Sequence, residues 1–144
     1  MSKFRVLGWM VLLGLLATAV ACGGGNNTAD EAVVSAFTQE QATELAENAM
    51  QGFASGDYAE WSRDWSEAMK NGITEAAFLA YRQEVINNMG TYQSIESVTI
   101  APSTTRGYVR WVVVAHFENG QMEFAFSFRQ DGKLVEGIFP RQLG

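Results

Sequence analysis

Cysteine, histidine and proline are scarce in this chain of 144 residues, which contains one cysteine, one histidine and two prolines. A single cysteine excludes an intramolecular disulfide and a zinc site built on several thiolates, so packing has to stabilise the fold. One histidine among scattered carboxylates offers no clustered ligand set, and we expect no metal site and no cofactor. Basic residues are also few, because ten Lys and Arg stand against sixteen Asp and Glu. This charge balance argues against nucleic acid as a partner.

Motifs of the common enzyme classes are also absent from the sequence. It has no glycine-rich phosphate loop and no serine or cysteine nucleophile motif. The remaining composition is that of an ordinary globular protein, with 47% hydrophobic, 12% aromatic and 18% charged residues. We therefore expect one folded domain and no catalytic residues.

Residues 1–21 have the pattern of a secretory signal peptide. Lys3 and Arg5 precede an apolar run that ends in small residues just before Cys22. This run is shorter than the roughly 20 residues that a helix needs to cross a bilayer, so cleavage is favoured over a permanent span. The sequence Ala-Val-Ala-Cys at 19–22 resembles the bacterial lipobox, in which the cysteine thiol is lipidated and the signal is cut before it. The alternative is a signal cut before a free thiol, but the only cysteine occupies the position that lipidation requires.

The signal and the cysteine predict where the protein resides. Residues 22–37 are expected to form a lipidated cysteine and a flexible, glycine-rich linker, and 38–144 a folded domain. Removal of Lys3 and Arg5 leaves the domain more acidic, so anionic headgroups repel it and the lipid on Cys22 is the membrane contact. We expect an extracytoplasmic protein of the cell envelope. Its lipid would lie in the outer leaflet of the plasma membrane, or in the outer membrane if the host has one.

Apolar residues recur with helical period in the first half of the domain. The spacing predicts three amphipathic helices at about 38–54, 57–71 and 74–89, each followed by a glycine-containing stop. Thr38 with Gln41 forms a capping-box pattern, and Asp57 and Thr74 are the predicted N-caps of the next two helices.

Beyond Gly90 the period becomes two, which predicts strands at about 95–101, 107–118, 121–129 and 133–139. A two-residue turn at Asn119-Gly120 would pair Phe117 with Met122, and a turn at Asp131-Gly132 would pair Phe128 with Val135. Both registers predict one buried face, which comprises Val109, Trp111, Val113, Ala115, Phe117, Met122, Phe124, Phe126, Phe128, Val135, Gly137 and Phe139. Burial of Trp111, Phe126 and Phe128 against the helices is the central packing prediction.

The opposite face of the sheet is mixed, with an apolar strip and charges towards its ends. This arrangement suits a symmetric homodimer, although a solvated sheet face is the alternative. The same register places His116 opposite Glu123 and Arg110 opposite Arg129; an exposed cross-strand pair is favoured over a general base for the histidine. The candidate interface residues are Arg110, Val112, Val114, His116, Ala125, Arg129, Glu136 and Ile138.

Several short motifs occur in order along the domain: Gly56-Asp57-Tyr58, Met69-Lys70, Thr74, the segments 90–95, 117–120 and 131–134, Gly137 and Pro140. They resemble the bacterial domain of unknown function family 3887 over about residues 40–140. The order of helices and strands resembles the nuclear transport factor 2-like superfamily, whose cone encloses a pocket in ketosteroid isomerase and scytalone dehydratase. The resemblance implies an α+β fold in which three N-terminal helices pack on a curved, cone-shaped, four-stranded antiparallel sheet.

Aromatic residues of the predicted helices could line a cavity against the sheet, although plain core packing is the alternative. The candidate pocket residues are Tyr58, Trp61, Asp64, Trp65, Tyr81 and Trp111. The resemblance implies a small binding or accessory module, for a small apolar ligand or a protein partner, without catalysis of its own. The alternative function is a small lyase or isomerase that uses the cone cavity.

Overall fold

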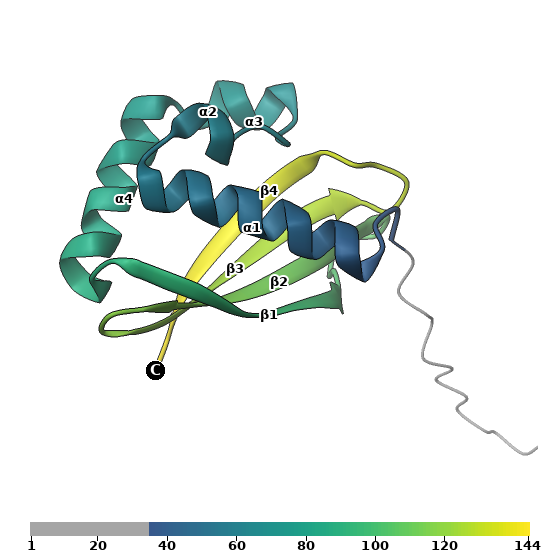
Figure 1. Ribbon diagram of the computed structural model, residues 1–144. Coiled ribbons are helices and arrows are strands. Elements are labelled where there is room, and N and C mark those ends of the chain that lie inside the picture. The colour runs from purple at the N-terminus through teal and green to yellow at the C-terminus, as the bar shows by residue number, and fades with distance from the viewer. Residues whose placement is uncertain (1–34) are drawn as a thin grey trace, which may run out of the picture. The chain divides into compact units, whose positions relative to one another are not determined.

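A computed structural model describes residues 35–144, and the predicted signal peptide and Cys22 lie outside the described residues. Four helices precede four strands: α1 (Gln39–Ser55), α2 (Tyr58–Trp61), α3 (Glu67–Gly72), α4 (Glu75–Met89), β1 (Tyr92–Pro102), β2 (Tyr108–Phe117), β3 (Gly120–Arg129) and β4 (Val135–Leu143). The strands form one antiparallel sheet in the order β1-β2-β3-β4, and α1 crosses one face of it (Figure 1). The predicted α+β class and four-stranded antiparallel sheet are confirmed.

The ends of α1 follow from its predicted caps. The Thr38 side chain accepts a hydrogen bond from the Gln41 backbone N–H, and the Gln41 side chain accepts one from the Thr38 backbone N–H. Gly56 ends the helix with a φ of 78°, a left-handed conformation that glycine adopts without a Cβ clash. Arg82 of α4 adds a contact that the sequence pattern did not indicate, because its guanidinium donates to Phe53 O and Ala54 O at 2.6 Å. A cation at the C-terminal carbonyls of a helix is favourable.

The predicted second helix is wrong as one continuous element. It is divided into α2 and α3, and the residues between them leave the helical path. Trp65 forms a parallel bridge with Val135. The Val135 N–H donates to Asp64 O at 2.8 Å, and the Ser66 N–H donates to Val135 O at 2.9 Å. These bonds to the beginning of β4 replace the helical hydrogen bonds, and a contact so distant in sequence leaves no trace in local periodicity.

The β2–β3 hairpin has the predicted faces but not the predicted register. Phe117 pairs with Gly120 rather than with Met122, so the register differs by two residues and the turn consists of Glu118 and Asn119. Tertiary contacts hold this turn, because the Asn119 N–H donates to Met89 O and the Glu118 N–H to Thr91 O. Side chains alternate with a period of two along a strand, so a two-residue shift keeps each one on its face.

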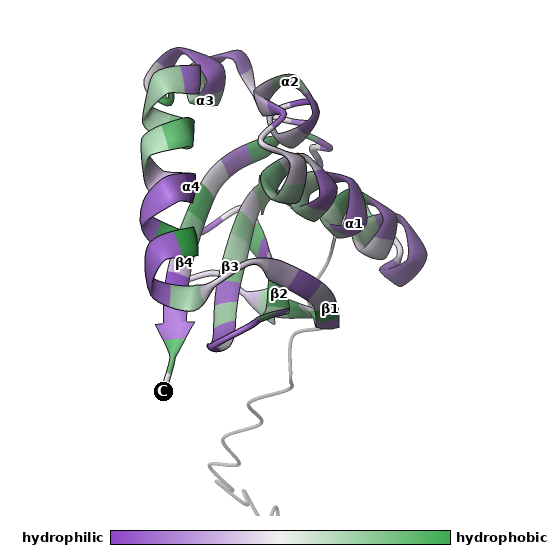
Figure 2. Cartoon of the chain, turned by 60° about the vertical axis from the view of Figure 1, so that its left-hand side comes forward, coloured by the Kyte–Doolittle hydropathy of each residue, from purple (hydrophilic) through white to green (hydrophobic). Residues whose placement is uncertain are grey.

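The inner face of the sheet forms the core together with the helices. Trp111, Phe126 and Phe128 are 3%, 1% and 1% exposed, so their predicted burial is confirmed. Hydrophobic and hydrophilic residues alternate along the strands and around α1 in Figure 2. Phe37, which the sequence assigned to the linker, packs its ring 4.9 Å from that of Phe128.

A bulge in β4 changes the face of its second half. Val135 pairs with Phe128 as predicted, but the register then shifts and Gly137 pairs with Ser127. Ile138 therefore pairs with Phe126 on the inner face, whereas Phe139 pairs with Ala125 on the outer face and is 60% exposed. The predictions that Phe139 is buried and that Ile138 faces outward are both wrong. Gly137 lies directly after the bulge; a glycine within a strand is compatible with such an irregularity but does not indicate which face the following residues take.

Candidate functional site

A pocket of about 250 Å³ lies between α4 and the edge strand β4, and we call it the α4–β4 pocket. Helices α2 and α4 and the turn that follows α3 form one side of the pocket. Strands β3 and β4 form the other side. The lining residues are Trp61, Ile73, Ala77, Phe78, Tyr81, Phe124, Ile138 and Pro140. Ala77 and Pro140 are exposed, and the remaining lining residues are buried or half-buried. An apolar pocket of this size suits a small apolar molecule.

Aromatic packing fixes the wall of the pocket. The ring of Trp61 stacks on that of Phe78, with centroids 4.4 Å apart and an interplanar angle of 26°. Phe53 lies behind these residues and contacts Tyr81 and Phe124 with ring centroids 6.3 and 5.8 Å away. These edge-to-face contacts join α1, α4 and β3 behind the pocket. The shape of the wall is therefore set by the core.

Tyr81 is the lining residue with an ionisable side chain. Burial, with a smaller contribution from the Glu84 carboxylate, raises the pKa of Tyr81 to about 12. The phenol is therefore neutral and carries its proton throughout the physiological pH range. It can donate a hydrogen bond, but it is a poor general base at neutral pH.

Buried hydrogen-bond donors lie in this region without acceptors. Tyr81 Oη and Trp61 Nε1 have no hydrogen-bond partner among the described residues, and the same holds for the indole N–H groups of Trp65 and Trp111. By contrast, the hydroxyl of Tyr58 donates to Ile73 O at 2.5 Å. Because most buried polar groups in folded proteins are paired, the unpaired donors in the pocket wall call for an explanation.

The structure separates the six predicted pocket residues. Trp61 and Tyr81 line the α4–β4 pocket, whereas Trp65 and Trp111 are core residues, 2% and 3% exposed. Tyr58 packs against Trp65 with ring centroids 6.1 Å apart. Asp64 lies elsewhere, in a hollow with Phe37 and Lys133, and its carboxylate is 3.2 Å from the Arg63 guanidinium.

Sequence reasoning missed most of the pocket lining. Ile73, Ala77 and Phe78 belong to the third predicted helix or its approach, which the pattern treated as ordinary packing. Ile138 and Pro140 reach the pocket only because the bulge turns the second half of β4. The alternation of apolar and polar residues along the predicted strand did not indicate that Ile138 or Pro140 would line a pocket.

The outer face of the sheet carries most of the predicted interface residues. Val112 pairs with Ala125, which pairs with Phe139, so these three side chains form an apolar row across three strands. Val114 pairs with Glu123, whose carboxylate accepts from the Arg141 guanidinium at 2.9 Å. Ile138 is not part of this face, Glu136 lies at the bulge, and Phe139 takes the place that was predicted for Ile138.

The predicted arginine pair does not form. Arg110 pairs with Ser127 and donates to Pro102 O at 3.1 Å, whereas Arg129 pairs with Tyr108 and lies 3.9 Å from the Asp131 carboxylate. The two-residue shift of the hairpin register separates the arginines, and each has a partner of its own. The like-charge contact predicted across the strands is therefore absent from this face.

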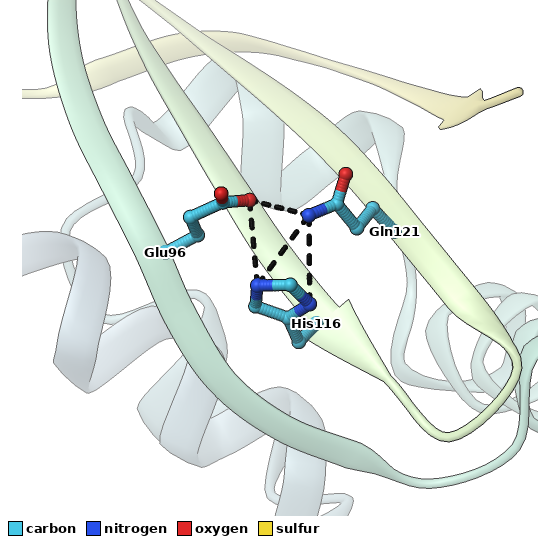
Figure 3. A network of polar contacts seen from close by, with 3 residues as sticks. All are labelled: Glu96, His116 and Gln121. Atoms are coloured by element: carbon cyan, nitrogen blue, oxygen red, sulfur yellow. Dashed lines mark hydrogen bonds and ion pairs between the residues drawn. The ribbon is translucent and has the colours of Figure 1, made fainter.

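His116 belongs to a polar cluster on the outer face, with Glu96 and Gln121 (Figure 3). Its Nε2 atom is 3.4 Å from the Glu96 carboxylate, and Gln121 contacts both ring nitrogens and Glu96. The predicted pairing with Glu123 is wrong because His116 pairs with Gln121. The imidazole side chain is 43% exposed and does not line the α4–β4 pocket. Its geometry is that of an exposed cross-strand contact.

Among residues 35–144, no helix is both long and apolar enough to cross a membrane. The same part of the chain contains no group of three or more His, Cys, Asp or Glu side chains that could hold a metal ion.

Comparisons with known proteins identify a family and a fold but no activity. Residues 46–136 match the family described as "Protein of unknown function (DUF3887)". A solved structure described as "NMR structure of protein from Ruminococcus gnavus ATCC 29149" is similar, with a TM-score of 0.58 and 16% sequence identity. The match covers 72% of this chain and 90% of that chain. At this identity the similarity extends to the fold alone. No curated protein matches the chain.

Proposed function

Because this chain belongs to the DUF3887 family, whose description assigns no activity, we propose a function from its own residues. The protein is a binding or accessory module that holds a small apolar ligand in the α4–β4 pocket, without catalysis of its own. The observation that carries this proposal is the pocket itself, with its aromatic and aliphatic lining and exposed mouth residues. Such a site recognises its ligand by burial of apolar surface.

The alternative, a lyase or isomerase that uses the same cavity, has less support. Proton transfer at neutral pH needs a side chain with a suitable pKa in contact with the substrate. Among the residues that line the pocket, Tyr81 is the ionisable one, and its pKa of about 12 makes it a poor base. Binding without reaction is the simpler function for this lining.

The proposed architecture is that of the nuclear transport factor 2-like superfamily. The order of elements supports this proposal, because helices come first and an antiparallel sheet follows. A second support is the bulge in β4, because a β-bulge bends its strand and a cone-shaped sheet needs bent strands. The pocket lies between the sheet and the helices, as a cone cavity would.

We further propose that the protein is anchored to the extracytoplasmic side of a membrane through a lipid on Cys22. The support is the signal-peptide pattern of residues 1–21 and the cysteine that follows it. Metabolic labelling of the host with a fatty acid tests the proposal: the wild-type protein becomes labelled and a Cys22→Ser variant does not. An unlabelled wild-type protein would contradict lipid anchoring.

The pocket proposal predicts that a larger side chain at its mouth blocks binding. Ala77 is exposed and lines the pocket, so Ala77→Leu is expected to reduce affinity about tenfold or more without disturbing the core. The apolar probe is α-methylstyrene, titrated into the purified protein and followed by the NMR signals of Trp61 and its neighbours.

The matched control for this experiment is Ala76→Leu. Ala76 is an exposed neighbour in the same helix that does not line the pocket, so this variant is expected to bind the probe as the wild type does. Equal affinities of wild type and Ala77→Leu would contradict the pocket as the binding site. Native mass spectrometry of protein purified from its host would then identify a retained ligand by mass.

A second copy of the chain is the partner that we propose for the outer face of the sheet. Residues 35–89 carry nine acidic and three basic residues, whereas 90–144 carry five of each. Contact through the sheets would keep the acidic helical layers apart and bury the exposed ring of Phe139 with Val112. Sedimentation of the purified protein tests this, and a monomer at high micromolar concentration would contradict the homodimer.

A further inference from the structure

Two residues that line the α4–β4 pocket, Trp61 and Tyr81, each carry a buried hydrogen-bond donor without an acceptor among the described residues. Trp61 is 5% exposed, and neither its Nε1 atom nor Tyr81 Oη has a partner among the described residues. Burial without a partner costs folding free energy, since both donors would be hydrogen-bonded to water in the unfolded chain. Two such donors on residues of one pocket therefore call for a partner that the described residues do not supply.

The neighbouring Tyr58 shows that this aromatic cluster can pair a buried hydroxyl. The Tyr58 hydroxyl donates to Ile73 O at 2.5 Å, and its ring lies 5.9 Å from that of Phe78. Phe78 also stacks on Trp61 in the pocket wall. Pairing is thus available next to the pocket, yet two of the four unpaired donors among the described residues belong to pocket-lining side chains, and the other two are the core indoles of Trp65 and Trp111.

We propose that the ligand of this pocket is an uncharged, mainly apolar molecule with one hydrogen-bond acceptor oxygen, such as a ketone. Tyr81 Oη and Trp61 Nε1 donate to that oxygen. This inference rests on the proposed function, because it describes the ligand of the same site. Both donor atoms are buried in the free protein, so binding requires a movement of the half-buried Tyr81 side chain, while Trp61 stays stacked on Phe78.

The charges around the pocket explain why the acceptor is uncharged. Its lining contains no lysine or arginine, so a carboxylate would lose its hydration without gaining a cation. The Glu84 carboxylate lies close enough to contribute to the raised pKa of Tyr81. The same negative charge would repel an anionic ligand. A neutral carbonyl avoids both penalties and still accepts from the protonated phenol.

The test compares two probes of nearly equal shape, acetophenone and α-methylstyrene, which differ in that a carbonyl oxygen replaces a methylene group. Each is titrated into wild type, Tyr81→Phe and Ala77→Leu. The wild type is expected to bind acetophenone about 3- to 10-fold more tightly than α-methylstyrene, in line with one net hydrogen bond. The indole N–H signal of Trp61 is expected to move downfield with acetophenone only.

Tyr81→Phe removes the hydroxyl and leaves the ring. It is expected to bring the affinity for acetophenone close to that for α-methylstyrene, while the affinity for α-methylstyrene stays at the wild-type value. Because the hydroxyl has no partner in the free protein, the melting temperature of Tyr81→Phe is expected to equal or exceed that of the wild type. The control Tyr58→Phe loses a hydrogen bond to Ile73 O, and its melting temperature is expected to fall.

The outcomes separate this inference from the function on which it rests. If wild type and Tyr81→Phe bind both probes with the same affinity and Ala77→Leu binds neither, the pocket function stands and the acceptor inference is overturned. The inference is also overturned if Tyr81→Phe weakens both probes equally, which indicates a structural role. If neither probe binds the wild type, both the pocket function and the inference are overturned.

Discussion

Truncation of Phe53 to alanine is expected to lower the free energy of unfolding by about 3–5 kcal/mol. Phe53 is 1% exposed. Its ring lies within 5.8–6.3 Å of the ring centroids of five other aromatic residues: Trp61, Phe78, Tyr81, Phe117 and Phe124. Those residues come from α2, α4, β2 and β3, so the cavity left by truncation borders most of the fold. Urea unfolding followed by tryptophan fluorescence measures the loss.

Leu134→Ala serves as the control for this truncation. Leu134 is 51% exposed, and its removal is expected to change the free energy of unfolding by no more than about 0.5 kcal/mol. A loss of less than about 1 kcal/mol for Phe53→Ala would contradict the packing described for the helix–sheet interface. Four of the five rings around Phe53 also line the α4–β4 pocket, so the same variant is expected to bind α-methylstyrene more weakly.

Gly52→Ala is expected to cost about 3 kcal/mol, although alanine has the higher helix propensity. A Cβ atom at this position in α1 would lie 2.8 Å from Trp61 Cα and closer still to the Trp61 backbone nitrogen. Backbone atoms cannot turn aside as a flexible side chain does, so α1 and α2 would have to separate. The Trp61 ring would move with them, and thermal unfolding together with the Trp61 indole NMR signal measures both effects.

Gly72 provides the matched glycine. It is the last residue of α3, and a Cβ atom there would meet nothing within 4 Å. Gly72→Ala is expected to leave the stability unchanged or raise it by about 0.4–1 kcal/mol, because alanine reduces the entropy of the unfolded chain. If Gly52→Ala and Gly72→Ala had equal stabilities, the close approach of α1 and α2 would be contradicted.

Local interactions explain which elements the sequence predicted well. Thr38 and Gln41 satisfy each other's backbone donors within one turn, and Gly56 ends α1 through its own backbone conformation. Thr74 caps α4 with one such bond, because its side chain accepts from the Ala77 backbone N–H. Such signals need only a few consecutive residues, so they can be recognised without knowledge of the rest of the fold.

The candidate site was less predictable because its two sides come from distant parts of the chain. Trp61 and Tyr81 could be selected as large aromatic residues on predicted helix faces. Whether such a ring lines a pocket or fills the core depends on what lies opposite, and Trp65 and Trp111 are buried in the core instead. The sheet side of the pocket depends on Ile138, whose face was reversed by the bulge.

The sequence by itself determined the α+β class, the caps of α1 and α4, and the buried face of β2 and β3, because these depend on short-range periodicity and local hydrogen bonds. Only the tertiary structure decided the division of the second predicted helix, the two-residue shift of the hairpin and the direction of Ile138 and Phe139. Each of these depends on a partner in another element of the fold: Val135 for the segment after α2, the end of α4 for the hairpin turn, and Ser127 of the adjacent strand β3 for the bulge. Hydrogen bonds and packing between such segments exist only after the chain has folded, so no local pattern records them.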